Sequence, residues 1–183
     1  GEEYPTVAFI GGSITEGAGL DNEWNALSND ERAAYNNDFS AYRAANCYAG
    51  LVGKYMSEKY GTKNVINAGI GGTGSDFGFN RIYDECIKYD PELVFIEFAV
   101  NDYWAGEKTK SNMESIVRNL NSMKNPPYIV FLYTGQYNNV TGNELSSSGN
   151  IAALQQQVAD YYGIPSINLS VDVYEKYVNE RIS

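Results

Sequence analysis

Histidine is absent from the 183-residue sequence. It is the side chain that most often acts as a general base near neutral pH, so these residues contain no imidazole for acid–base or nucleophilic chemistry. Cysteine is also scarce: Cys47 and Cys86 are the two present, with no Cys-x-x-Cys spacing. Both fall inside helical patterns, which favours buried small hydrophobic side chains over a disulfide or a metal pair.

Basic residues are few and long apolar runs are lacking. Lys and Arg total 13 against 23 Asp and Glu, a formal net charge of −10, which disfavours nucleic acid as a partner. No apolar run approaches the ~18 residues of a membrane span, and residues 1–5 lack the features of a signal peptide. We expect one domain over 1–183, with no membrane partner and with any leader already removed. Sixteen tyrosines and many asparagines are typical of a secreted, extracellular protein of a polysaccharide-degrading bacterium.

Strands and helices are predicted to alternate along the chain. Five short apolar runs predict buried strands, at 6–11, 64–68, 93–100, 128–134 and 164–169. Apolar residues at helical spacing lie between them, at 48–56, 79–86, 113–120 and 151–161. Continuously apolar strands indicate a sheet that is covered on both faces. The alternation therefore predicts an α/β protein, a three-layer α/β/α flavodoxin-like sandwich with a five-stranded parallel sheet.

Four loops are predicted to meet at one edge of this sheet. In such folds ligands bind outside the carboxyl ends of the strands, near the point where strand order reverses. Ser13 follows the first strand, the glycines of 69–74 follow the second, Asn101 and Asp102 follow the third, and residues 135–137 follow the fourth. We expect the functional site among these loops.

A long polar stretch at 21–46 exceeds an ordinary loop and predicts an insertion beside this edge. It either shapes a substrate cleft or is a solvated surface excursion. Four aromatic residues near the predicted cleft are suited to stacking on sugar rings, with ordinary packing as the alternative. They are Trp24, Tyr103, Trp104 and Tyr137.

Ser13 lies in the sequence Gly-Gly-Ser-Ile-Thr-Glu-Gly at 11–17. The glycines permit a tight turn that holds the hydroxyl exposed at a helix start, as a nucleophile requires. The alternative is that Ser13 only caps the following helix. A nucleotide P-loop is excluded, because Ala18 and Gly19 stand where that motif needs Lys and Ser or Thr.

The segment 69–74 matches Gly-x-Gly-x-x-Gly, which raises dinucleotide binding. The match fits poorly for two reasons. The motif follows the second strand instead of the first, and the acidic residue expected at the end of the next strand is missing there, because Asp90 and Glu92 precede that strand. Two other roles remain open for these glycines: a backbone N–H donor aimed at a developing oxyanion, or close packing.

The third strand ends in Asn101 and Asp102. The Asn101 amide can reach the Ser13 loop as an oxyanion donor, or act as a cap. Asp102 is predicted to be structural, holding the loop by hydrogen bonds to backbone. Glu97, within the apolar strand, needs a partner if buried, and Arg81 is the one we predict.

Together the three motifs resemble the SGNH (GDSL-like) hydrolases over nearly the whole chain. Residues 11–17 are similar to the family's Ser block with Gly12 for Asp, 67–73 to its Gly block, and 99–102 to its Asn block with Ala99 for Gly. The resemblance implies ester cleavage through an acyl-enzyme on Ser13. It also implies an oxyanion hole formed by the N–H groups of Ser13 and Gly72 and the Asn101 amide. We expect no cofactor, and no metal because the acidic, histidine-free loops show no ligand cluster.

The family's fourth block, Asp-x-x-His, does not carry over. Residues 172–175 mimic it with Glu175 in the last place, but they follow the fifth strand too closely and offer a carboxylate for an imidazole. One explanation is that the parent protein is an esterase whose C-terminal catalytic segment, or a separate segment, supplies the histidine. The other is a degenerate relative that serves as a carbohydrate-binding module.

The lack of an apolar lid segment disfavours long acyl chains, and the aromatic residues near the predicted cleft suit sugar rings. The predicted substrate is therefore a short-chain acyl ester, with acetyl groups on carbohydrate as the first choice. Without histidine we expect the chain alone to be weak or inactive. Tyr103, Trp104 and Tyr137 are the predicted substrate-binding residues.

Overall fold

The structure is a computed structural model that describes residues 5–134, 140–141, 144–145, 147–170, 172 and 176. Within residues 140–150 the described part is limited to backbone. Tyr137 and Glu175, both singled out from the sequence, lie outside the described residues.

Five parallel strands form the central sheet, in the order β2-β1-β3-β4-β7. They are β1 (Thr6–Gly11), β2 (Asn64–Gly69), β3 (Leu93–Glu97), β4 (Tyr128–Tyr133) and β7 (Ser166–Asn168). The order reverses direction between β2 and β3, so β1 and β3 flank the switch point at which such sheets bind ligands. Every residue of β1 is buried, as its continuous apolar run predicts. The predicted α/β fold with a five-stranded parallel sheet is confirmed.

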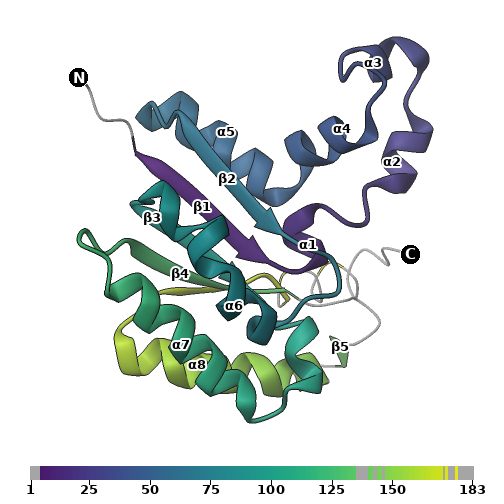
Figure 1. Cartoon of the computed structure of the whole chain (residues 1–183). Coiled ribbons are helices and arrows are strands. Elements are labelled where there is room, and N and C mark those ends of the chain that lie inside the picture. The colour runs from purple at the N-terminus through teal and green to yellow at the C-terminus, as the bar shows by residue number, and fades with distance from the viewer. Residues whose placement is uncertain are drawn as a thin grey trace.

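Helices cover both faces of the sheet (Figure 1). On one face, α6 (Ser75–Glu85), α7 (Lys108–Asn121) and α8 (Ser147–Tyr162) pack on alternate residues of the strands and bury the larger core. On the other face, α1 (Ser13–Glu16) and α5 (Tyr48–Tyr60) lie over the opposite set, which includes Val7 and Phe9. The four helical patterns seen in the sequence correspond to α5, α6, α7 and α8.

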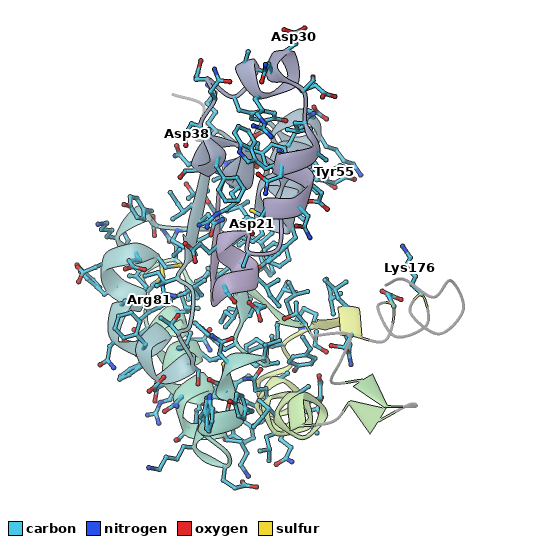
Figure 2. All side chains as sticks on the ribbon, turned by 90° about the vertical axis from the view of Figure 1, so that its right-hand side faces the viewer. Asp21, Asp30, Asp38, Tyr55, Arg81 and Lys176 are labelled. Atoms are coloured by element: carbon cyan, nitrogen blue, oxygen red, sulfur yellow. The ribbon has the colours of Figure 1, made fainter. Side chains whose placement is uncertain are left out.

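The predicted insertion folds into three short helices, α2 (Asp21–Ala26), α3 (Asn29–Ala33) and α4 (Phe39–Asn46). It extends from the body of the molecule, with Asp30 at its tip (Figure 2). Trp24 packs against Phe39 and Tyr42, with ring centroids 5.8 and 5.3 Å apart, and forms a small aromatic core of the insertion. Trp24 therefore has the packing role that the sequence left open as an alternative.

Several predicted boundaries differ from the structure. The third strand ends at Glu97 instead of Val100, because the N–H groups of Asn101 and Asp102 both donate to the Phe98 carbonyl and turn the chain into the 3₁₀ helix η2 (Asn101–Trp104). The sequence also missed the short elements η1 (Ile87–Tyr89), β5 (Val140–Thr141) and β6 (Glu144–Leu145).

Cys47 and Cys86 are free and buried, as predicted. The Cys47 thiol also caps α5 by accepting a hydrogen bond from the Gly50 N–H. None of the helices in the described ranges combines the length and the apolar character that a membrane span needs.

Candidate active site

The Ser13 turn joins β1 to α1 at the carboxyl edge of the sheet. Gly11 and Gly12 leave no room for side chains: a Cβ on Gly11 would lie 2.0 Å from Thr15 Oγ1, and one on Gly12 would lie 3.0 Å from Asn101 Nδ2. Gly12 thus allows the Asn101 amide to approach the chain directly before Ser13, and Gly11 leaves room for the Thr15 hydroxyl. Ser13 is half-buried and begins α1, so its N–H has no partner within that helix. Its hydroxyl has no hydrogen-bond partner among the described residues.

The glycine turn after β2 packs directly on α1. A Cβ on Gly69 would lie 2.2 Å from the Glu16 nitrogen, and the Ile70 N–H donates to the Gly11 carbonyl at 3.1 Å. The Gly71 N–H donates to Glu16 Oε2 at 2.8 Å. Gly72 follows with a φ of +74°, a left-handed conformation that favours glycine. The hydrogen bond to Glu16 uses the Gly71 N–H. The oxyanion donor predicted in this turn is the next N–H along the chain, that of Gly72.

A cavity of about 510 Å³ opens beside these groups. Its lining includes Gly72, Asn101, Trp104 at 82% exposure, and Lys108 and Asn112 from α7. The Trp104 ring contacts that of Tyr103, with centroids 4.1 Å apart. No described residue of the insertion 21–46 lines this cavity.

Asp102 lines the floor of the cavity and is 1% exposed. Its carboxylate accepts hydrogen bonds from the Ser75 N–H at 2.7 Å, from Gln155 Nε2 at 3.0 Å and from the Thr109 hydroxyl. These contacts join η2 to the starts of α6 and α7 and to α8. The structural role predicted for Asp102 agrees with this arrangement.

Glu97 lies beneath the Ser13 turn and is also 1% exposed. Its two carboxyl oxygens accept hydrogen bonds from Thr15 Oγ1 at 3.0 Å and from Thr134 Oγ1 at 2.7 Å. Burial raises the pKa of the Glu97 carboxyl above its ordinary value, while the hydrogen bonds from Thr134 and Thr15 act in the opposite direction. Burial likewise raises the pKa of Tyr48, whose phenol lies 2.8 Å from Thr15 Oγ1.

The predicted pair of Glu97 with Arg81 is wrong. Arg81 lies on α6, which covers the opposite face of the sheet from the Glu97 side chain. It forms an ion pair with Glu85 and donates to the carbonyls of Ala68 and Gly11, the latter at 2.9 Å. Arg81 therefore holds the ends of β2 and β1, directly before the two glycine-rich turns.

A second ion pair was missed by the sequence reasoning. Arg43 of α4 pairs with Glu16 of α1, the same carboxylate that accepts the Gly71 N–H. The insertion thus contacts the site through Arg43 rather than by lining the cavity. Arg43 and Glu16 are 27 residues apart in the sequence and belong to no shared motif, so the sequence did not indicate this contact.

The structure places the turns that carry Ser13, Gly72 and Asn101 at one edge of the sheet, and their roles as nucleophile and oxyanion donors stay a prediction. Trp104 joins them at the cavity and Tyr103 supports Trp104, whereas Tyr137 lies outside the described residues. In the described part of the chain, no three side chains of the types His, Cys, Asp or Glu gather as metal ligands would.

Several solved structures share this fold. A two-domain esterase active on acetylated mannans is 28% identical, with a TM-score of 0.73 over 98% of this chain and 41% of that chain. An acetylxylan esterase from Geobacillus stearothermophilus is 16% identical, with a TM-score of 0.67 over 96% of this chain and 80% of that chain. AlinE4, an SGNH-hydrolase family esterase, is 19% identical, with a TM-score of 0.64 over 100% and 82% of the two chains.

The chain therefore spans about two fifths of the length of the mannan esterase, 41% of it. A comparison with curated protein sequences finds no match. The model of the GDSL-like Lipase/Acylhydrolase family matches residues 9–181, which include the Ser13, Gly72 and Asn101 loops. On this match and on the shared fold, the chain belongs to the GDSL-like lipase/acylhydrolase family, the SGNH hydrolases.

Proposed function

We propose that this chain carries the nucleophile and the oxyanion hole of an ester hydrolase that removes short acyl groups, acetyl first among them, from carbohydrate. The observation that carries the proposal is the meeting of the Ser13 turn, the Gly72 turn and the Asn101 amide beside one cavity of about 510 Å³. Backbone and amide N–H donors fixed around a serine hydroxyl suit acyl transfer.

In the proposed reaction, Ser13 Oγ forms a bond to the ester carbonyl carbon, and the carbonyl π electrons move to its oxygen. The N–H groups of Ser13 and Gly72 and the Asn101 amide stabilise that oxyanion. Collapse of the intermediate breaks the bond to the sugar oxygen, which leaves as an alcohol after taking up a proton. Water then attacks the acyl-serine, releases the carboxylic acid and restores Ser13.

The proton on Ser13 needs an acceptor, and the 183 residues include no histidine. No described residue accepts a hydrogen bond from the Ser13 hydroxyl. We infer that the base is a histidine supplied by a segment that is not part of this sequence, in the same protein or in a separate one. Serine hydrolases that lose one member of the triad retain an acceleration of about 10³–10⁴ over water, which comes from the oxyanion hole and substrate binding alone.

A carbohydrate ester is favoured by two observations. Trp104 is 82% exposed at the cavity, where its face is available for stacking on a sugar ring, and polar groups from Asp76, Lys108 and Asn112 line the same space. The second is the 28% identity with an esterase described as active on acetylated mannans. The secreted location expected from composition fits a polymeric substrate.

A second candidate function, a carbohydrate-binding module without catalysis, is favoured by the absence of histidine alone. It would use the same cavity and Trp104, but it would give Ser13 no reactivity. The two functions therefore differ in the behaviour of Ser13.

The test compares this chain with its Ser13→Ala variant in p-nitrophenyl acetate hydrolysis, with and without added imidazole as an external base. We expect a slow Ser13-dependent rate that imidazole raises, after subtraction of the rate that imidazole gives with Ser13→Ala. Labelling by a fluorophosphonate, in which Ser13 Oγ displaces fluoride, should follow the same pattern. Equal rates for both proteins under all conditions, together with binding of a mannan oligosaccharide, would support the binding module instead.

A further inference from the structure

A buried carboxyl group stands at the end of an otherwise apolar strand. β3 consists of Leu93, Val94, Phe95 and Ile96 before Glu97, and Phe98 follows. Taking a carboxyl out of water is costly unless it is hydrogen-bonded or paired, and no cation pairs with Glu97 in the described part of the chain. An apolar side chain would avoid that cost, so the function of Glu97 has to lie in the hydrogen bonds that it makes.

These hydrogen bonds tie together three elements around the site. Thr15 Oγ1 of α1 and Thr134 Oγ1 at the end of β4 reach the two carboxyl oxygens at 3.0 and 2.7 Å. The Tyr48 phenol of α5 lies 2.8 Å from the same Thr15 hydroxyl. In addition, the Gly12 N–H donates to the Glu97 backbone carbonyl at 3.3 Å. The carboxyl is thus linked to the Ser13 turn by its side chain and by its backbone.

The helix that carries Ser13 cannot hold its own orientation. α1 has four residues, far fewer than a helix needs to be stable in isolation. Residues two positions apart in a helix point about 200° away from each other, so Thr15 faces the sheet when Ser13 faces the site. Thr15 is 0% exposed, in agreement with this geometry, and Ser13 is half-buried.

We propose that Glu97 is a positioning residue for the nucleophile: by holding Thr15 against the end of the sheet, it sets where α1 presents the Ser13 hydroxyl relative to Gly72 and Asn101. This inference rests on the proposed function, because the group that it positions is the Ser13 hydroxyl. Glu97 does not touch the cavity, so its effect on substrate binding is small and its effect on Ser13 reactivity is large.

The test measures amide hydrogen exchange in the Ser13 turn. Three amides report on it directly, since Glu16 N–H donates to the Gly12 carbonyl, and the N–H groups of Gly17 and Ala18 donate to the Ser13 carbonyl. Amides in the buried part of α7 report on global unfolding. We expect Thr15→Val to raise exchange at 16–18 by about threefold to tenfold, the value of one net hydrogen bond, with exchange in α7 changed much less.

Variants at Glu97 separate its hydrogen bonds from its bulk. Glu97→Gln retains one acceptor and one donor for the two threonines, so exchange at 16–18 should stay near that of the unchanged protein, whereas Glu97→Leu should raise it. If Glu97→Leu fails to fold, Thr15→Val still decides. Thr62→Val is the matched control: Thr62 is a buried threonine whose hydroxyl has no partner among the described residues, and its loss should leave 16–18 unchanged.

The same proteins are then labelled with a fluorophosphonate. Thr15→Val and Glu97→Leu should slow Ser13 labelling by about tenfold or more, and Glu97→Gln should restore most of the rate. If the unchanged chain labels no faster than Ser13→Ala, the proposed function fails, but the exchange data still decide whether Glu97 holds the turn. Unchanged exchange at 16–18 in Thr15→Val, or an equal rise in Thr62→Val, overturns the inference.

Discussion

Asp102 offers the sharpest test of how the cavity floor is held. Its buried carboxylate accepts from the Ser75 N–H, the Thr109 hydroxyl and Gln155 Nε2. Substitution by Ala removes every one of these acceptors, and each buried donor left unpaired costs about 1–3 kcal/mol. Gln155 Nε2 also donates to Thr109 Oγ1 at 3.0 Å, so part of the network survives. We therefore expect Asp102→Ala to lower the free energy of unfolding by about 3–5 kcal/mol.

Asp102→Asn should cost much less, about 1 kcal/mol. Its carbonyl oxygen retains the Ser75 N–H, and its new NH₂ group requires an acceptor. Gln155 Oε1 is buried with no partner among the described residues, so rotation of the Gln155 amide would supply one. The Thr109 hydroxyl can also turn to accept. The difference between the two variants measures the hydrogen bonds themselves, because both remove the charge.

The assay is urea unfolding of the unchanged chain, the two Asp102 variants and Asp160→Ala, an exposed control on α8 expected to change stability by less than about 0.5 kcal/mol. A loss of 3–5 kcal/mol would be a large fraction of the roughly 5–15 kcal/mol typical of a domain. A cost below about 1 kcal/mol for Ala, or equal costs for Ala and Asn, would refute the reasoning. A stable Asn variant with Ser13 labelling slowed a hundredfold would instead give Asp102 a part in the chemistry.

Three further predictions concern the site. Asn101→Ala should lower the Ser13-dependent kcat by about 10²–10³ with little change in KM, since an oxyanion donor acts in the transition state; an unchanged kcat would remove Asn101 from the oxyanion hole. Trp104→Ala should raise KM for acetylated mannan oligosaccharides while leaving p-nitrophenyl acetate hydrolysis unaffected, and an equal effect on both substrates would contradict a sugar platform. Because its pKa is raised in the folded protein from an ordinary 4.5, Glu97 contributes stability that is full below about pH 4.5 and is lost as pH rises through the folded-state pKa. The stability of Glu97→Gln relative to the unchanged chain, from urea unfolding at several pH values, should therefore rise with pH, and a pH-independent difference would contradict a raised pKa.

The sheet could be predicted from sequence because strands buried on both faces appear as continuous apolar runs, as in β1 and β3. The meeting of Ser13, Gly72 and Asn101 followed from topology alone, since parallel strands place their carboxyl ends at one edge. The ends of the strands were less predictable. Phe98, Ala99 and Val100 continue the apolar run of β3, but the hydrogen bonds of Asn101 and Asp102 to the Phe98 carbonyl end the strand early.

The partners of Glu97 could not be read from the sequence, because Thr15 and Thr134 are neutral residues far from it along the chain. Opposite charge suggested Arg81, but charge does not identify the face of the sheet on which a side chain lies. Side chains alternate between the two faces of a strand, so Glu97 shares a face with Phe95, which packs under α5. The right-handed crossovers that lead from β1 to β2 and back to β3 place α5 and α6 on opposite faces, so the fold itself separates Glu97 from Arg81.

The arrangement of costly features at this edge favours the ester hydrolase over the binding module. Gly72 is held at a positive φ, Glu97 is buried with no cationic partner in the described ranges, and the Gly71 N–H donates to Glu16, which also pairs with Arg43. A sugar-binding surface built on Trp104 requires none of these, because stacking depends on an exposed ring and a few polar groups. Donors fixed in advance around a serine hydroxyl are of use where negative charge develops on a reacting oxygen. Among the described residues none accepts a hydrogen bond from the Ser13 hydroxyl, and the imidazole experiment supplies an external base in its place.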